Sequence, residues 1–303
     1  DAQRTNESPA GSSHGAPGRH FHGPSDLHMH SVLSDGTEPP AQVVEAAHRH
    51  GMRTMALTDH DTTAGWDEAA LAATSLGMTF LPGMELSAKY EWRSVHILAY
   101  LFDPNHAGLI AETDRIRDSR LGRAEAMVNN IARDYDLSWD DVIAQTSDGA
   151  TVGRPHIADA LVARGHASDR SAAFAEILHP SRGYFVSHYA PDPALAVSLI
   201  VEAGGVRTIA RPVTAGRERM LPMGVLRHLI DLGLGGFEID HRENTEDGKQ
   251  VLRKLALEHE LIVTGSSDYH GTGKPNVPGE YTTTDEMVGR IIARATGSAP
   301  VFP

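Results

Sequence analysis

The sequence predicts an α/β fold in which short strands alternate with longer helices. Two observations indicate it. From residue 24 onward, brief apolar runs are separated by longer amphipathic segments. Several of these runs also end in His, Asp or Glu. Because α/β barrels gather their functional groups at the carboxyl ends of the strands, this pattern is typical of an α/β barrel.

Seven segments have the length and apolar character of strands. They are residues 25–30, Thr54–Thr58, Thr79–Met84, Val95–Leu101, Val206–Ala210, Gly236–Asp240 and Leu261–Gly265. In the first segment, the alternation of a strand places Asp26, His28 and His30 on one face and Leu27 and Met29 on the other. Two imidazoles at positions i and i+2 of a strand can bind one metal ion together.

Helices are expected between most of the strands, and one long stretch contains helices alone. Pro39 and Pro40 open an apolar run that ends at Gly51, which is a normal start and stop for a helix. Further helices are expected over 66–76 and 245–259, and over 106–134, 138–146, 155–165 and 170–179. We therefore expect a disordered tail over 1–23, a barrel formed by 24–103 and 193–303, and a helical insertion over 104–192.

Composition excludes several classes of function. The chain carries 27 Lys and Arg against 40 Asp and Glu, a net charge of −13, so no broad surface for duplex DNA is expected. It has no cysteine, so a metal would be held by nitrogen and oxygen, which suits Zn, Mn, Fe or Mg. No apolar run approaches the length of a membrane span, and residues 1–23 lack the apolar core of a signal peptide. A cytoplasmic protein without membrane contact is the expectation.

Metal-capable residues recur at the ends of separate strands. The relevant stretches are Leu57-Thr58-Asp59-His60-Asp61, Pro82-Gly83-Met84-Glu85, Val95-His96-Ile97 and Gly265-Ser266-Ser267-Asp268-Tyr269-His270, besides the first strand. One buried histidine is usually a core residue. Five strand ends that all carry His, Asp or Glu predict a multinuclear metal site.

These motifs together resemble the PHP (polymerase and histidinol phosphatase) family. The similarity covers Asp-x-His-x-His-Ser-x-x-Ser-Asp-Gly at the start, then Thr-Asp-His-Asp, Pro-Gly-x-Glu, x-His-Ile-Leu and Gly-Ser-x-Asp-x-His, in order over residues 25–271. It is greatest with the stand-alone phosphoesterases, which carry a helical insertion after the fourth strand. The resemblance implies a distorted seven-stranded β/α (TIM-like) barrel. It also implies hydrolysis of nucleoside 3′,5′-bisphosphates, of RNA from its 5′ end, or of other phosphomonoesters.

The resemblance also implies a set of metal ligands. One metal would be held by His28, His30, Glu85 and Asp268, a second by Asp35, His60 and His270, and Glu85 would reach towards a third together with His96. Asp26 and Asp59 are expected to orient ligand histidines through their other ring nitrogen.

One family position departs from the pattern. Relatives show Ala-His-Pro after the fifth strand, where this chain has Ala210-Arg211-Pro212. Arginine is cationic at any working pH and cannot ligate a metal. We therefore expect two divalent ions (Mn, Zn or Fe) and a third site that is weak or absent. Arg211 is expected to bind a phosphate oxygen or to pair with Glu85.

Substrate contacts are predicted mainly from the insertion. Arg117 and Arg120 match phosphate-facing arginines of the relatives, whereas Arg123 fits a solvated, salt-bridged helix face equally well. His156 and His188 could donate a hydrogen bond to phosphate or protonate the leaving oxygen, with a core or capping role as the alternative. Weaker candidates at the barrel mouth are Arg217 and His241.

The predicted reaction is attack of a metal-bridged hydroxide on a phosphomonoester, in line with the leaving oxygen. The expected substrate is small, phosphorylated and nucleotide-like, such as a nucleoside 3′,5′-bisphosphate or a short 5′-phosphorylated RNA. A histidinol-phosphate phosphatase or another small phosphomonoesterase is the first alternative. A non-catalytic metal-binding PHP module and a hydrolase of the amidohydrolase type are the others.

Overall fold

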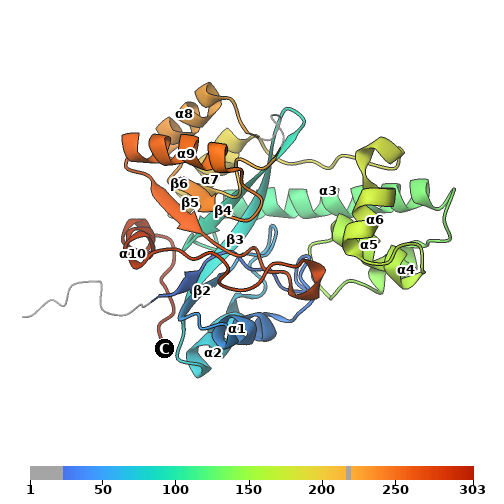
Figure 1. Ribbon diagram of the computed structural model, residues 1–303, viewed down its shortest axis with the longest axis horizontal. Helices are drawn as coiled ribbons and strands as arrows, with labels where there is room; N and C mark the ends of the chain where they lie inside the picture. The colour runs from blue at the N-terminus through green and yellow to red at the C-terminus, as the bar shows by residue number, and fades with distance from the viewer. Residues whose placement is uncertain (1–22, 216–219) are drawn as a thin grey trace, which may run out of the picture.

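A computed structural model describes residues 23–215 and 220–303 of the chain. Its centre is a seven-stranded sheet whose strands follow one another in chain order (Figure 1). The strands are β1 (Ser25–Asp26), β2 (Thr54–Leu57), β3 (Thr79–Tyr90), β4 (Arg93–Tyr100), β5 (Val206–Ile209), β6 (Gly236–Asp240) and β7 (Ile262–Gly265). The tail residues 1–22 and the candidate Arg217 lie outside the described residues.

The sheet curves into a nearly closed barrel, which confirms the predicted α/β barrel of seven strands. The segment after β1 meets the segment after β7, where Met29 and Tyr269 form a parallel bridge. The backbone N–H of His30 donates to the carbonyl of Tyr269 at 2.8 Å. The two histidine-bearing segments at opposite ends of the sheet are thereby brought side by side.

One strand runs against the others. β4 pairs antiparallel with both β3 and β5, whereas the remaining neighbours are parallel. The link from β3 to β4 is a tight hairpin at Glu91 and Trp92, with no helix between the strands. His96, near the start of β4, therefore lies at the same end of the barrel as residues that follow the parallel strands.

The first strand is shorter than predicted. Only Ser25 and Asp26 join the ladder with β2, although a strand over 25–30 was expected. The predicted alternation nevertheless continues beyond the ladder. Leu27 and Met29 are fully buried in apolar clusters, while His28 and His30 project into the polar site.

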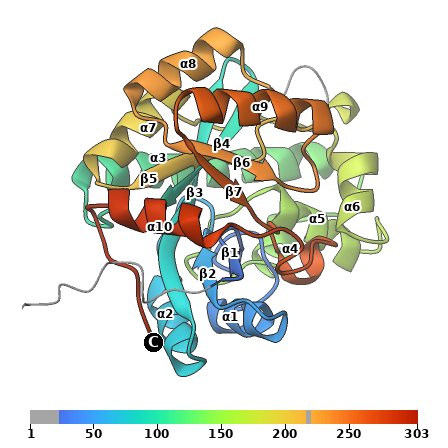
Figure 2. The same cartoon turned by 60° about the vertical axis from the view of Figure 1, so that its left-hand side comes forward.

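Helices surround the barrel (Figure 2). They are α1 (Pro40–Arg49), α2 (Trp66–Ser75), α7 (Pro193–Glu202), α8 (Met223–Leu232), α9 (Glu246–Glu258) and α10 (Asp285–Arg294). The core consists of apolar side chains from strands and helices, among them Ile97, Leu199, Phe237 and Leu252. Among residues 23–215 and 220–303, no helix is both long and apolar enough to cross a bilayer.

A group of helices lies between β4 and β5. They are α3 (Ala107–Ile131), α4 (Trp139–Ile143), α5 (Arg154–Ala163) and α6 (Arg170–Ala173), followed by a π-helical turn (Phe174–Leu178) and a 3₁₀ turn (Pro180–Arg182). Helices α4 to α6 gather at the far end of α3, beside the barrel (Figure 1). The carboxyl half of α3 packs with them around a separate apolar core that includes Met127, Ile131, Ile157 and Leu161.

Candidate active site

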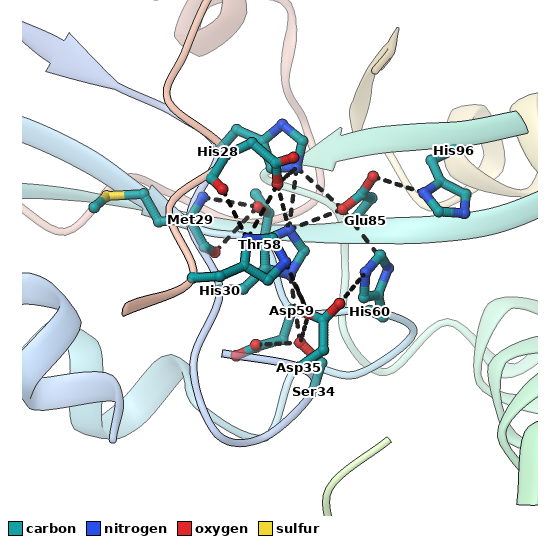
Figure 3. Close-up of polar contacts among 12 residues, drawn as sticks. His28, Met29, His30, Ser34, Asp35, Thr58, Asp59, His60, Glu85 and His96 are labelled. Atoms are coloured by element: carbon teal, nitrogen blue, oxygen red, sulfur yellow. Dashed lines mark hydrogen bonds and ion pairs between the residues drawn. The ribbon is translucent and has the colours of Figure 1, made fainter. Parts of the chain in front are cut away.

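The structure brings the predicted metal ligands of the first group together. One ligand atom from each of His28, His30, Glu85 and Asp268 lies within 4.8 Å of the others. The Nε2 atom of His28 is 3.0 Å from Glu85 Oε2 and 3.1 Å from Asp268 Oδ1. All four residues are at most 2% exposed. Glu85 and the two histidines face one another at the centre of Figure 3.

A second group adjoins the first and contains Asp35, His60 and His270, with His30 between the two groups. The Nε2 atom of His270 is 3.0 Å from Asp35 Oδ1, and that of His60 is 3.4 Å from Asp35 Oδ2. Glu85 connects both groups to His96, whose Nδ1 lies 2.9 Å from Glu85 Oε1.

The histidines are oriented as metal ligands require. The Nδ1 atom of His28 contacts Glu238 Oε2 at 2.7 Å, and that of His270 donates to the carbonyl of Asp268 at 2.7 Å. Both Nε2 atoms therefore face the carboxylates of the cluster. Buried atoms His60 Nδ1 and His270 Nε2 find no well-directed hydrogen bond in the described part of the chain. A divalent cation fits such a set of nitrogen and oxygen donors.

The cluster concentrates negative charge in a buried place. Burial would raise the pKa of Asp35, but His270 and His60 outweigh it and hold that pKa well below its usual range. Burial would lower the pKa of His30, but its hydrogen bonds to Asp268 and Glu85 outweigh it and raise the pKa to about 9. Asp35 therefore stays ionised, and His30 keeps a proton unless a metal ion takes its place.

The predicted role of Asp26 and Asp59 is wrong. Asp26 accepts backbone N–H groups from Ser267 and Gly279 at 3.1 and 2.9 Å, and so fixes loops rather than an imidazole. Asp59 accepts from the hydroxyls of Ser31 and Ser34 and contacts no ligand histidine directly.

Glu238 orients His28 instead, and the sequence prediction missed it. The available signal was a charged residue in the middle of the apolar strand Gly236–Asp240.

Arg211 lies beside the cluster and does not pair with Glu85, which was one of its two predicted roles. Its guanidinium forms an ion pair with Glu243, and its backbone N–H donates to Glu238 Oε1 at 2.9 Å. Burial would lower the pKa of Arg211, but Glu243, Asp268 and Glu85 outweigh it and raise it. A fixed positive charge therefore stands next to the predicted ligands.

A cavity of about 920 Å³ opens from the cluster. Its lining includes the predicted ligands Asp35, His60, Glu85, His96, Asp268 and His270. It also includes cations and aromatic rings, among them Lys89, Arg120, Arg123, Arg154, Trp92 and Phe185. Acidic ligands and basic side chains thus share one cavity.

Three cations crowd together in the lining of this cavity, namely Lys89, Arg120 and Arg123. Arg120 donates to Asp61 Oδ2 at 3.1 Å and to Ser87 Oγ at 2.7 Å. Burial, then Arg120 and Arg154, lower the pKa of Arg123 to about 9. The buried Nε of Arg123 has no hydrogen-bond partner among the described residues. Burial, Arg123 and Arg120 also lower the pKa of Lys89. Such a set of cations favours an anion.

Arg117 does not join this set. It donates to the backbone carbonyl of Asp61 at 3.1 Å and pairs with Asp114 at 2.6 Å. It is absent from the described residues that line the cavity, so the predicted phosphate contact is not supported by its position.

His156 has a capping role rather than a catalytic one. Its Nδ1 accepts the N–H of Gly153 at 2.9 Å, and the ring also hydrogen-bonds the backbone carbonyl of Ser34. It is 3% exposed and is not among the described cavity-lining residues. Both ring nitrogens are therefore engaged, which contradicts the predicted donation to phosphate or to the leaving oxygen.

His188 lines the cavity but lacks the proton that its predicted role needs. Burial, Arg120 and Arg123 lower the pKa of His188 to about 2, so the ring is neutral. Its Nδ1 donates to the carbonyl of Tyr189 at 2.6 Å. Without a bound anion, the remaining nitrogen can accept a hydrogen bond but carries no proton to give to a leaving oxygen.

The barrel mouth holds two further polar residues near Asp268. His241 is fully buried, and its Nε2 lies 3.5 Å from Asp268 Oδ2. Lys274, which the sequence prediction missed, donates to the same oxygen at 2.9 Å. Both therefore contact Oδ2 of the predicted ligand Asp268, whereas His28 contacts its Oδ1.

Comparison with known proteins places this arrangement among phosphoesterases. A profile of the PHP domain matches residues 26–167. The 3′,5′-nucleoside bisphosphate phosphatase of Chromobacterium violaceum is 34% identical, over 82% of this chain and 88% of its own length. The 5′-3′ exoribonuclease of Haemophilus influenzae is 33% identical, over 81% of this chain and 89% of its own. A solved structure from Bifidobacterium adolescentis, provisionally described as a metal-dependent phosphoesterase, has a TM-score of 0.88 and 41% identity, over 90% of this chain and 96% of its own.

Proposed function

Because this chain belongs to the PHP domain family, we propose that it is a metal-dependent phosphoesterase that hydrolyses phosphomonoesters of small nucleotide-like substrates. The relatives named above are a phosphatase of nucleoside bisphosphates and an exoribonuclease, which supports this substrate class over the alternatives. The observation that carries the proposal is that a histidine–carboxylate cluster and several cations line one and the same cavity.

We assign the metal ligands from the two groups in the structure. His28, His30, Glu85 and Asp268 would hold one divalent ion, and Asp35, His60 and His270 a second. When bound, two such ions would lower the pKa of water enough to supply hydroxide as the nucleophile near neutral pH, and would offset charge on the phosphoryl oxygens. Mn, Zn and Fe suit these donors.

The cations that line the cavity would bind the phosphate of the substrate. Arg120 and Arg123 are held in place by α3, and Lys89 extends from β3 towards them. Their crowding is relieved when a phosphate lies among them, because each pKa that its neighbours depress recovers beside an anion. His188 accepts a hydrogen bond there, from a hydroxyl or base of the substrate.

Arg211 limits the number of metal ions to two. Its cationic guanidinium replaces the histidine that would complete a site with Glu85 and His96, and it remains paired with Glu243. Arg211→His should raise the content of tightly bound ions from two to three per chain, measured by mass spectrometry of the dialysed protein. Three ions already present in the wild type would contradict this assignment.

A substrate panel tests the function. With Mn²⁺ added, the protein is assayed against adenosine 3′,5′-bisphosphate, adenosine monophosphate, histidinol phosphate, a short 5′-phosphorylated RNA and an aryl amide. We expect release of phosphate or of nucleotides from the nucleotide-like substrates, complete loss on chelation, and recovery with Mn²⁺ or Zn²⁺. Turnover of the amide alone, or unchanged turnover after exhaustive chelation, would overturn the proposal.

A further inference from the structure

The loop that carries His60 is held by a residue of the helical insertion. The hydroxyl of Thr151, just before α5, donates to the backbone carbonyl of His60 at 2.7 Å. The backbone N–H of Thr151 donates in turn to the carbonyl of Leu33, two residues before Asp35, at 2.8 Å. Thr151 is 3% exposed, so both bonds are shielded from water. One residue thus ties two ligand loops to the insertion, the His60 loop through its side chain and the Asp35 loop through its backbone.

The loop of Asp35 is held twice more. Arg170, at the start of α6, donates from Nη1 to the backbone carbonyl of Asp35 at 2.7 Å, and Asp159 of α5 fixes its other nitrogens at 2.9 and 2.7 Å. His156 of α5 hydrogen-bonds the carbonyl of Ser34 next door. These contacts use backbone carbonyls, so the carboxylate of Asp35 stays free to face His60 and His270.

The third ligand loop meets the same arginine. Gly273, three residues after His270, lies so close to the guanidinium of Arg170 that a Cβ at this position would collide with it. The insertion therefore touches the loops of Asp35, His60 and His270. The imidazole of His28 in the other group is instead oriented by Glu238, which belongs to the barrel.

We propose that Thr151, His156 and Arg170 are positioning residues for the metal site of Asp35, His60 and His270, and that metal binding there and docking of the insertion stabilise each other. Ligand loops must hold their donor atoms closely for tight metal binding, and the groups that support ligands typically change affinity 10- to 100-fold when altered. The coupling is reciprocal: if docking of the insertion strengthens metal binding, metal binding must stabilise the docked insertion by the same free energy. This inference rests on the metal sites of the proposed function but not on its substrate.

Two substitutions remove the contacts with little change of shape. Thr151→Val deletes the hydroxyl that binds the His60 carbonyl, and Arg170→Met deletes the donor to the Asp35 carbonyl. Matched controls within the insertion are Thr146→Val, whose hydroxyl bonds the carbonyl of Ile143, and Arg164→Met, whose partners are Asp136 and Asp141. Among the described residues, neither control residue forms a hydrogen bond or ion pair with a ligand loop.

Mn²⁺ titration of the metal-free protein, followed by electron paramagnetic resonance, measures each site without any turnover. Asp35→Asn and His28→Gln identify which binding step belongs to which group. We expect Thr151→Val and Arg170→Met to weaken the step that Asp35→Asn removes, by about tenfold or more. The step that His28→Gln removes should remain, and both controls should resemble the wild type. Equal weakening of both steps, or no weakening, would overturn the inference.

Hydrogen exchange tests the reverse direction. Mn²⁺ should slow amide exchange in α5 and α6 of the wild type, and this slowing should disappear in Asp35→Asn. Amide exchange rates in α5 and α6 that do not change on addition of Mn²⁺ would refute the coupling. If the protein binds Mn²⁺ in this way yet hydrolyses no phosphate ester, the proposed activity fails and the inference stands. If the wild type binds no metal, the proposed activity and the inference about the insertion are both wrong.

Discussion

The two halves of the predicted metal cluster differ in what holds them. In the barrel half, formed by His28, His30, Glu85 and Asp268, a buried glutamate of β6 orients the first histidine. In the insertion half, formed by Asp35, His60 and His270, the loops are fixed by side chains that come from outside the barrel. The ligands of one metal cluster can therefore be oriented in part by residues of the sheet and in part by residues of a separate group of helices.

Glu85→Gln should have the largest effect, because Glu85 is a predicted ligand of the barrel half and also contacts His60 of the insertion half. Its Oε2 lies 3.0 Å from His28 Nε2 and 3.6 Å from His60 Nδ1, and its Oε1 lies 2.9 Å from His96 Nδ1. Loss of its charge should remove several kcal/mol of stabilisation and lower kcat by roughly a thousandfold. Steady-state kinetics together with metal analysis checks this. Retention of both ions and of turnover would show that Glu85 is not shared.

Glu238→Gln should affect the barrel half alone. Glutamine can still accept from His28 Nδ1 but lacks the charge that strengthens the imidazole as a ligand. We expect about 10- to 100-fold weaker Mn²⁺ binding at the step that His28→Gln removes, with the other step unchanged. Thr151→Val should have the opposite pattern and weaken only the other step. Equal weakening of both Mn²⁺ binding steps in Glu238→Gln would show that the two halves are not supported separately.

Arg117→Met should have a smaller effect, confined to the insertion half. Arg117 supports the carbonyl of Asp61, next to His60, but its side chain is 34% exposed. An exposed contact of this kind is worth at most about 1 kcal/mol, so the Mn²⁺ step of the insertion half should weaken roughly threefold. A rise in KM with unchanged metal binding would instead support a phosphate contact for Arg117.

His188→Gln should leave the acid limb of the pH profile unchanged. Because burial and neighbouring arginines lower the pKa of His188 to about 2, the ring carries no ionisable proton between pH 5 and 9. The pH dependence of kcat/KM reports groups of the free enzyme, so its acid limb should have the same midpoint in wild type and variant. A shift of that midpoint would show that His188 is protonated in the working enzyme.

The sequence predicted the ligand cluster better than the supports around it. Histidines and carboxylates at strand ends are separated by short, regular spacings, so alternation alone indicated that His28 and His30 share a face. Glu238 and Thr151 are far from those motifs in the chain, and their roles depend on which loops meet in space. For His156 the structure favours the capping role that was the alternative, because hydrogen bonds to Gly153 and Ser34 engage its ring. For His188 only Nδ1 is engaged, by the carbonyl of Tyr189. Neither partner could be read from the motifs.

The reversal of β4 was also not predicted. Regular α/β alternation suggests parallel strands, and it places residues of a site after each strand. Two features of the sequence pointed the other way. No helix separates residues 79–90 from 93–100, and His96 stands near the beginning of its strand rather than its end.

Because β4 is reversed, the chain after Tyr100 lies at the end of the barrel opposite the predicted metal cluster. Helix α3 then runs back towards the cluster. The helix has 25 residues, about 37 Å of rise, and along it Arg117, Arg120 and Arg123 pass Asp61, Ser87 and Val186 in turn. Deleting or adding a single residue before Arg117 would turn all three arginines by about 100° and misalign them together. Substitutions on the exposed side of α3 should therefore be tolerated far better than any change in its length, so natural variation in length is expected in the loops beyond Ile131.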